Sequence, residues 1–189
     1  MKRIVGVALV GIAALLSGCG EESTAADEEQ IRDVLTQATD ATNAWDGDKM
    51  AALTCAKYRE EARSFESVVP PMQVFSTAAE GAKEMGREQF ADLIGAQFGG
   101  ASQESLLAVA DAVIGDDQTA YGPAMLDVMK QSMKFKLEKV ANIVVADDDA
   151  RADTTISFTV GSEPPQTSET KAKLVKEDGQ WKDCTPPGE

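Results

Sequence analysis

The chain has 189 residues, with 18 lysine and arginine residues against 32 acidic ones and a formal net charge of −14. A surface this negative repels phosphate backbones, so nucleic acid is not an expected partner. The sequence contains no histidine. This excludes Ser-His-Asp and Cys-His catalysis, histidine metal ligands and the usual proton shuttle near neutral pH. We therefore expect no metal site, no cofactor and no enzymatic activity.

The first 19 residues have the pattern of an exported and lipid-modified protein. Two basic residues precede an apolar run, Ile4–Leu16, which is shorter than the roughly 20 residues of a bilayer span. The tetrad Leu16-Ser17-Gly18-Cys19 resembles the lipobox of bacterial lipoproteins. In that family the cysteine thiol is alkylated by diacylglycerol and the chain is cut before it. The resemblance implies a cleaved signal peptide over 1–18 and acyl chains such as palmitate on Cys19. The alternative is an ordinary secretory peptide with a chance cysteine.

A lipid on Cys19 predicts where the mature protein lies. Two or three acyl chains anchor a protein stably without a spanning helix, so we expect attachment to the extracytoplasmic face of the cell membrane. Residues 19–26 are small and polar, and they predict a flexible lipidated tether. Removing residues 1–18 takes away two of the 18 basic residues. The mature chain therefore has 16 basic against 32 acidic residues, a net charge of −16.

The remaining cysteines predict a disulfide. The chain has three cysteines, and lipid on Cys19 leaves Cys55 and Cys184. An oxidising compartment favours joining them, and the bond would tie the end of the domain to an early helix. The alternative is two free buried thiols.

The spacing of apolar residues predicts helices first and strands afterwards. Helical periodicity covers about 27–45, 48–65, 71–85, 90–98, 106–114 and 125–133. Alternation then predicts strands over about 134–146, 150–160, 170–176 and 180–184, with Ala152, Thr154 and Ile156 on one face of the second. This order predicts an α+β fold, with N-terminal helices packed on a curved antiparallel sheet of about four strands. We expect one domain over 27–185, with a helical insertion over 66–130 and a short tail over 186–189.

Two stretches carry a family resemblance. The helix end "AWDGD", the cysteine in the next helix and the final "EDGQWKDC" resemble small actinobacterial envelope lipoproteins with a nuclear-transport-factor-two-like cone fold. In those domains the closing strand often reads Gly-x-Trp-Lys-x-Cys, matched here by Gly179, Trp181, Lys182 and Cys184. The resemblance implies a cone in which the tryptophan points inward. The insertion over 66–130 departs from it and would either cap or fill the cone.

Acidic and methionine-rich stretches have structural and functional interpretations. Asp46-Gly47-Asp48, Asp116-Asp117 and Asp147-Asp148-Asp149 are candidate calcium ligands. None has EF-hand spacing, and each lies where a cap or turn is expected, which is the favoured interpretation. A methionine-rich helix, with Met125, Met129 and Met133, is either core or an adaptable lipid-accepting surface.

Large aromatic residues give the candidate pocket. Trp45, Tyr58 and Trp181 either line an apolar pocket or pack in the core. An enzymatic variant would add Asp40 or Asp183 as a general base, with Tyr58 as the proton donor.

Three functions follow from these features. The leading prediction is a non-catalytic, membrane-anchored binding or interaction module of the cell envelope, with an envelope protein or an apolar small molecule as its partner. The alternative is a carrier of an apolar ligand or lipid in an internal cavity. The third is a histidine-free isomerase, dehydratase or hydrolase.

Overall fold

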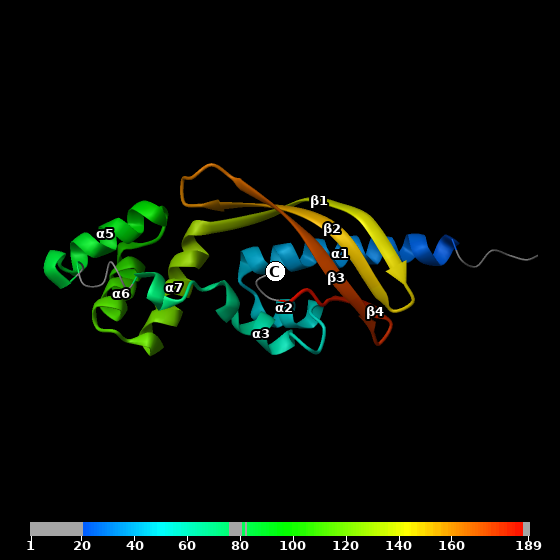
Figure 1. The fold of residues 1–189 in the computed structure, drawn as a ribbon, viewed down its shortest axis with the longest axis horizontal. Coiled ribbons are helices and arrows are strands. Elements are labelled where there is room, and N and C mark those ends of the chain that lie inside the picture. The colour runs from blue at the N-terminus through cyan, green and yellow to red at the C-terminus, as the bar shows by residue number, and fades with distance from the viewer. Residues whose placement is uncertain (1–20, 76–80, 82, 187–189) are drawn as a thin grey trace, which may run out of the picture.

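The computed structural model describes residues 21–75, 81 and 83–186, and it confirms the α+β class (Figure 1). The helices are α1 (Glu21–Ala44), α2 (Gly47–Leu53), α3 (Arg59–Ser64), α5 (Arg87–Gln97), α6 (Gln103–Ile114) and α7 (Gln118–Ser132), with 3₁₀ turns at Glu66–Val68 and Met72–Phe75. The strands are β1 (Met133–Ala146), β2 (Asp149–Val160), β3 (Gln166–Glu177) and β4 (Gln180–Asp183). They pair antiparallel in the order β1-β2-β3-β4 and curl into a half-barrel.

Helix α1 packs along the inner face of this sheet (Figure 1). The predicted alternation in β2 holds, because Ala152 and Thr154 are buried on this face. Alanines on the sheet let the helix approach closely, and larger apolar side chains of α1 cover them. The core members at this contact are Ile31, Val34, Leu35, Ala150, Ala152, Ala172, Leu174 and Trp181.

Asp27 fixes the N-terminal part of α1 to the hairpin of β3 and β4. Its Oδ1 accepts hydrogen bonds from Lys176 Nζ at 2.7 Å and from Trp181 Nε1 at 2.9 Å. The bond from Lys176, followed by that from Trp181, holds the pKa of Asp27 below its usual value. Asp27 and Trp181 are both buried, so each supplies the other with a partner that water would otherwise provide.

The two edges of the half-barrel are covered by the helical part of the chain. Asn43 makes the pair of hydrogen bonds that a neighbouring strand would make. Its side chain donates to the Phe135 carbonyl at 2.7 Å and accepts from the Phe135 amide at 2.8 Å. At the other edge the Cys55 amide donates to the Asp183 carbonyl of β4 at 2.8 Å. Each contact occupies part of the row of backbone groups that an edge strand presents to a foreign strand.

The predicted helical insertion forms a lobe with its own hydrophobic core. Helices α5, α6 and α7 pack around buried residues that include Phe90, Val109, Tyr121, Met125 and Met129. The lobe lies beside the sheet, at the end away from the β1–β2 turn (Figure 1). The turn after β2 passes close to it, because a Cβ on Gly161, whose φ is 56°, would lie 2.5 Å from the Gly99 nitrogen. Only glycine fits there.

Several predicted boundaries are wrong. The helix expected over 125–133 begins at Gln118, with Pro123 inside it, and ends before Met133. Helix α1 begins at Glu21 rather than near Asp27, so residues 21–26 of the expected flexible tether are helical. The high helix propensity of Ala25 and Ala26 favours this extension. The single helix predicted over 48–65 is two helices, because Thr54 and Cys55 leave the helix to pair with β4.

The N-terminal predictions lie outside the described residues. These are the signal peptide over 1–18, the lipidated Cys19 and the start of the tether. Within the described ranges, no helix combines the length and the apolar character that crossing a bilayer requires.

Replacing Asp27 with asparagine should weaken the fold in a pH-dependent way. Asp27→Asn removes the charge that pairs with the partly buried Lys176, so we expect a loss of about 1–3 kcal/mol in unfolding free energy at pH 7. The pKa of Asp27 is lowered in the fold, so this contribution is present above the unfolded pKa, near 3.8, and is lost as the pH falls below it. Urea unfolding at neutral and acid pH measures both effects.

The matched control is Asp33→Asn, at an exposed position of the same helix, which should leave the unfolding midpoint unchanged. Equal midpoints for the wild type and Asp27→Asn at pH 7 would contradict the role of Asp27.

Candidate ligand-binding site

A hollow of about 230 Å³ lies between α1 and the inner face of the sheet. Its wall is mostly apolar, formed by Leu35, Ala38, Met50, Phe135, Leu137, Ile156 and Ala172. Several of these side chains, including Phe135 and Ile156, are only half-buried, so solvent reaches the hollow. It contains no residue of the insertion over 66–130. The insertion therefore does not fill the half-barrel at this point.

Five threonines and one aspartate supply the polar part of this wall. The threonines are Thr39 and Thr42 of α1, Thr154 and Thr170 of the sheet, and Thr185 after β4; the aspartate is Asp183. Thr39 and Thr42 follow Leu35 and Ala38 at helical spacing, which places them on the same face of α1. None of these threonines was predicted as a site residue from the sequence. Thr154 alone could have been found, because it lies between Ala152 and Ile156 on the inward face of β2.

Asp183 is the titratable group of the hollow. Its Oδ1 accepts hydrogen bonds from the Thr185 amide at 2.9 Å and from Thr185 Oγ1 at 2.7 Å. Loss of water around the carboxyl raises the pKa of Asp183, and the two bonds from Thr185 oppose this rise. Asp40, the other predicted base, is exposed on α1 and does not line the hollow.

A second hollow, of about 190 Å³, adjoins the first and shares Thr42, Met50, Asp183 and Thr185 with it. Its other walls are Thr54, Tyr58, Ala62, Phe65, Ser67 and Val68. The start of the insertion, at Ser67 and Val68, thus borders this outer hollow. Asp183 lies where the two spaces meet.

The three aromatic residues expected to line one pocket are separated in the structure. Tyr58 lines the outer hollow. Trp45 packs on Phe65, with ring centroids 5.2 Å apart, and borders the core of the insertion. Trp181 is 1% exposed, in the core between α1 and the sheet. Spacing in the sequence shows that such residues face inward, but not which of two separate cores each one joins.

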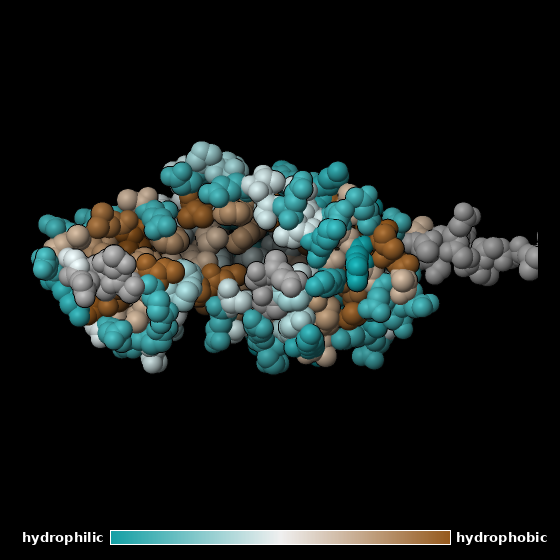
Figure 2. Space-filling model, in the orientation of Figure 1, coloured by the Kyte–Doolittle hydropathy of each residue, from teal (hydrophilic) through white to brown (hydrophobic). Residues whose placement is uncertain are grey.

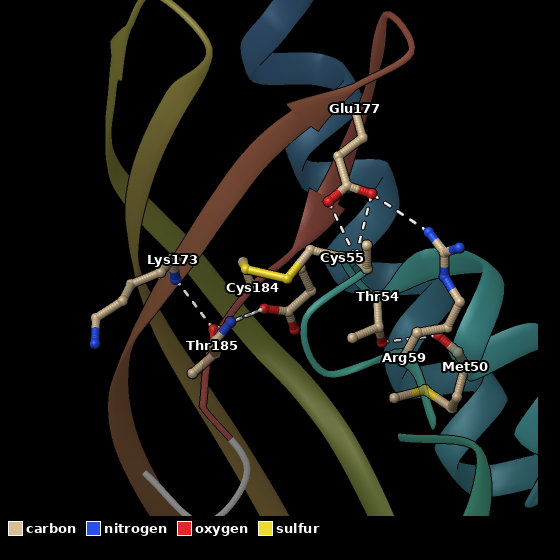
Figure 3. Close-up of a disulfide and its surroundings, with 10 residues drawn as sticks. Met50, Thr54, Cys55, Arg59, Lys173, Glu177, Cys184 and Thr185 are labelled. Atoms are coloured by element: carbon tan, nitrogen blue, oxygen red, sulfur yellow. Dashed lines mark hydrogen bonds and ion pairs between the residues drawn. A yellow bond between two sulfur atoms is a disulfide. The ribbon is translucent and has the colours of Figure 1, made fainter. Parts of the chain in front are cut away.

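A disulfide joins Cys55 to Cys184, the residue that follows Asp183 (Figure 3). The two sulfurs are 2.06 Å apart, and the cysteines are separated by 129 positions. Glu177 supports the same junction by accepting hydrogen bonds from the Ala56 amide at 3.0 Å and from Arg59 at 3.3 Å. These bonds hold the segment after α2 against the end of β3, which pairs with β4.

The candidate calcium ligands form caps and a turn. Asp46 caps α2 by accepting from the Lys49 amide, and Asp117 caps α7 by accepting from the amides of Thr119 and Ala120. Asp147, with a φ of 55°, lies in the β1–β2 turn. Within the part of the chain that the structure describes, no three acidic or cysteine side chains converge on a metal position.

An apolar groove of about 570 Å³ lies between α7 and the segment of residues 64–71. Tyr121 forms part of its wall, and its hydroxyl donates to the Pro70 carbonyl at 2.8 Å. Burial raises the pKa of Tyr121 to about 12. Figure 2 shows apolar colour around the indentation between the helical lobe and the rest of the molecule. The predicted methionine-rich stretch does not line this groove, since Met125 and Met129 are core residues.

Comparison with known proteins adds a weak structural likeness. The sequence matches no known protein-family model and no curated protein. Among solved structures, the fold is similar to that of Rv3472, a protein of unknown function from Mycobacterium tuberculosis. The TM-score is 0.43 and the sequence identity is 13%, covering 89% of this chain and 73% of that chain. A likeness at this level carries no functional argument.

Removing the disulfide should destabilise the domain without changing its fold. The Cys55→Ala/Cys184→Ala double variant should lose about 2–5 kcal/mol of unfolding free energy, because the bond restricts the unfolded chain over a long loop. Urea unfolding under oxidising conditions measures this loss. As a control, a reducing agent should lower the midpoint of the wild type to that of the double variant and leave the double variant unchanged. A double variant as stable as the oxidised wild type would contradict a structural role for the bond.

Proposed function

We propose that this chain is a lipid-anchored, extracytoplasmic binding module of the cell envelope, with a nuclear-transport-factor-two-like cone domain. In this proposal its non-catalytic task is to hold a small, mainly apolar molecule between α1 and the sheet. The observation that carries the binding part is the apolar hollow, which α1 and all four strands line with Leu35, Phe135 and Ile156 among others. A module built only for contact through its surface needs no such space.

The anchoring part of the proposal rests on residues 1–19 and on the start of α1. The lipobox-like tetrad ends at Cys19, and α1 begins two positions later, at Glu21. An anchor on Cys19 would therefore hold the domain close to the membrane through a helix rather than through a long flexible tether. The N-terminal end of α1 and the acidic β1–β2 turn lie at the same end of the molecule, with the helical lobe at the other (Figure 1). The lobe would then lie farthest from the membrane.

An enzymatic function has less support from this site. General acid–base catalysis needs a base and a proton donor that both reach the substrate, and the side-chain donor bonded to Asp183 is the hydroxyl of Thr185. Tyr58, the donor expected from the sequence, borders the outer hollow together with Asp183 but does not line the inner hollow, where the apolar wall lies. A binding function needs none of these proton transfers. It is therefore the simpler use of the hollow.

Lipid anchoring has a direct genetic test. Cys19→Ala removes the thiol that would become a thioether, so the full-length chain, expressed in a bacterium that processes lipoproteins, should move from the membrane fraction to the soluble extracytoplasmic fraction. Each buried methylene of an acyl chain contributes about 0.8 kcal/mol, so loss of the chains should release the protein completely. Immunoblots of separated fractions measure the distribution.

The Cys55→Ala/Cys184→Ala variant is the matched cysteine control and should stay in the membrane fraction. If Cys19→Ala remains membrane-bound, the anchor is not at this residue and the proposed placement fails.

Filling the hollow tests ligand binding. Thr39 and Thr36 both lie on α1, and each donates its hydroxyl hydrogen to the carbonyl four residues earlier. Thr39 borders the hollow, whereas Thr36 is exposed. We expect Thr39→Leu to weaken binding of 1-octanol roughly tenfold or more by occupying its space, and Thr36→Leu to leave it unchanged. Amide chemical-shift titrations by NMR measure both affinities. Equal weakening by the two variants, or none by Thr39→Leu, would contradict a ligand in this hollow.

A further inference from the structure

The hydroxyl hydrogens in the inner hollow are already used within the protein. Thr39 donates to the Leu35 carbonyl at 3.0 Å and Thr42 to the Ala38 carbonyl at 2.9 Å. Thr185 donates to Asp183 at 2.7 Å. Thr154 donates to the Thr170 carbonyl at 3.3 Å, and Thr170 Oγ1, 2.8 Å from Thr154 Oγ1, then donates to Thr154, so both hydrogens are used. A hydroxyl has one hydrogen but two lone pairs. Thr185 Oγ1 already accepts from the Lys173 amide at 3.0 Å. In this arrangement the threonines offer a bound molecule acceptors only.

Asp183 adds a further hydrogen-bond acceptor to this wall. Its Oδ1 accepts both bonds from Thr185, whereas Oδ2 has no hydrogen-bond partner among the described residues. Within the same residues, no lysine or arginine forms an ion pair with Asp183, and the environment raises its pKa through loss of water alone. A desolvated carboxylate without a cation is an unfavourable arrangement that a bound cation would relieve.

We propose that the hollow binds a small aliphatic amine, with the ammonium group donating to Asp183 Oδ2 and the hydrocarbon chain against Leu35, Phe135 and Ile156. This rests on the proposed function, since it names the ligand class of the same hollow. An ammonium has three donors and no acceptor, which complements a wall that has acceptors and no free donor. A charge-assisted bond of this kind is about twice as strong as a neutral one.

The complex is the same whichever partner brings the proton. An ionised Asp183 accepts a hydrogen bond from an ammonium directly. A protonated Asp183 transfers its proton to the nitrogen of a neutral amine, and the O–H bond that breaks is replaced by the new N–H bond. Both routes end in the pair of carboxylate and ammonium, and neither needs another reactant.

The dimensions indicate a short chain. At the roughly 30 Å³ that a water-sized group occupies, the hollow of about 230 Å³ takes about eight such groups. Fatty acids and other anions would bring a second negative charge next to Asp183 and have no donor to offer, so they are disfavoured. A neutral alcohol supplies one donor without a charge. Its affinity should therefore lie between that of an amine and that of a fatty acid.

Three probes with the same chain length test the inference at pH 7: octylammonium, 1-octanol and octanoate. By calorimetry and NMR titration of the folded domain, octylammonium should bind roughly tenfold or more tightly than 1-octanol, and octanoate should not bind measurably. Asp183→Asn keeps an oxygen for Thr185 but replaces Oδ2 with a donor, so the advantage of octylammonium over 1-octanol should disappear. Asp178→Asn, in the exposed β3–β4 turn, is the matched control and should retain it.

The outcomes separate the inference from the proposed function. If 1-octanol binds in the hollow but octylammonium has no advantage, or keeps it in Asp183→Asn, the amine inference is overturned and the binding function stands. If none of the three probes binds, both fail. Binding of octylammonium that Thr39→Leu does not reduce is binding to the acidic surface, which also overturns the inference.

A measurement on the wild type covers the case in which Asp183→Asn does not fold. The ¹³C shift of the Asp183 carboxyl should move on addition of octylammonium and stay constant with 1-octanol at the same occupancy. A constant shift in both titrations overturns the inference.

Discussion

The packing of α1 against the inner face of the sheet is the contact on which the rest of the structure depends. Small side chains on β2 and β3 bring the helix close, and the buried pair of Asp27 and Lys176, with the indole of Trp181, fixes its position along the sheet. A helix and a half-barrel each have an apolar face that neither can bury alone. With α1 in place, the sheet has an interior, and the same helix covers the β1 edge through Asn43.

The candidate site results from incomplete filling of that interior. Near Asp27 the helix packs on the hairpin of β3 and β4, and farther along α1 the short side chains of Ala38, Thr39 and Thr42 border the hollow. The wall that remains is apolar apart from threonine oxygens and Asp183. The protein uses the threonine hydrogens itself and holds Asp183 in place through Thr185 and the nearby disulfide. A rigid wall with oriented acceptors is a feature of binding sites more than of a core.

The helical lobe has a hydrophobic core of its own, which is joined to the sheet. The chain passes directly from α7 into β1, Met133 and Val160 pack against the lobe's core, and Gly161 closely approaches Gly99. The lobe therefore does not set the shape of the inner hollow, although its first residues border the outer one. In the proposed orientation it carries the apolar groove beside Pro70 away from the membrane.

The sequence by itself determined the class of the fold and the order of its elements, because periodicity and turn residues are local properties. The change from a helical to an alternating pattern near residue 133 marks the start of the sheet, and helix caps form within the acidic stretches that the sequence marks as caps or turns, at Asp46 and Asp117. Counting cysteines led to Cys55 and Cys184, since one thiol pair remains after Cys19. Only the tertiary structure decided which inward-facing side chains meet. It placed Trp45 and Trp181 in different cores, broke the second helix so that Cys55 could pair with β4, and brought Asp183 next to the threonines of α1, about 140 positions away along the chain. These are contacts between distant segments, and they depend on how the sheet curls rather than on any local pattern.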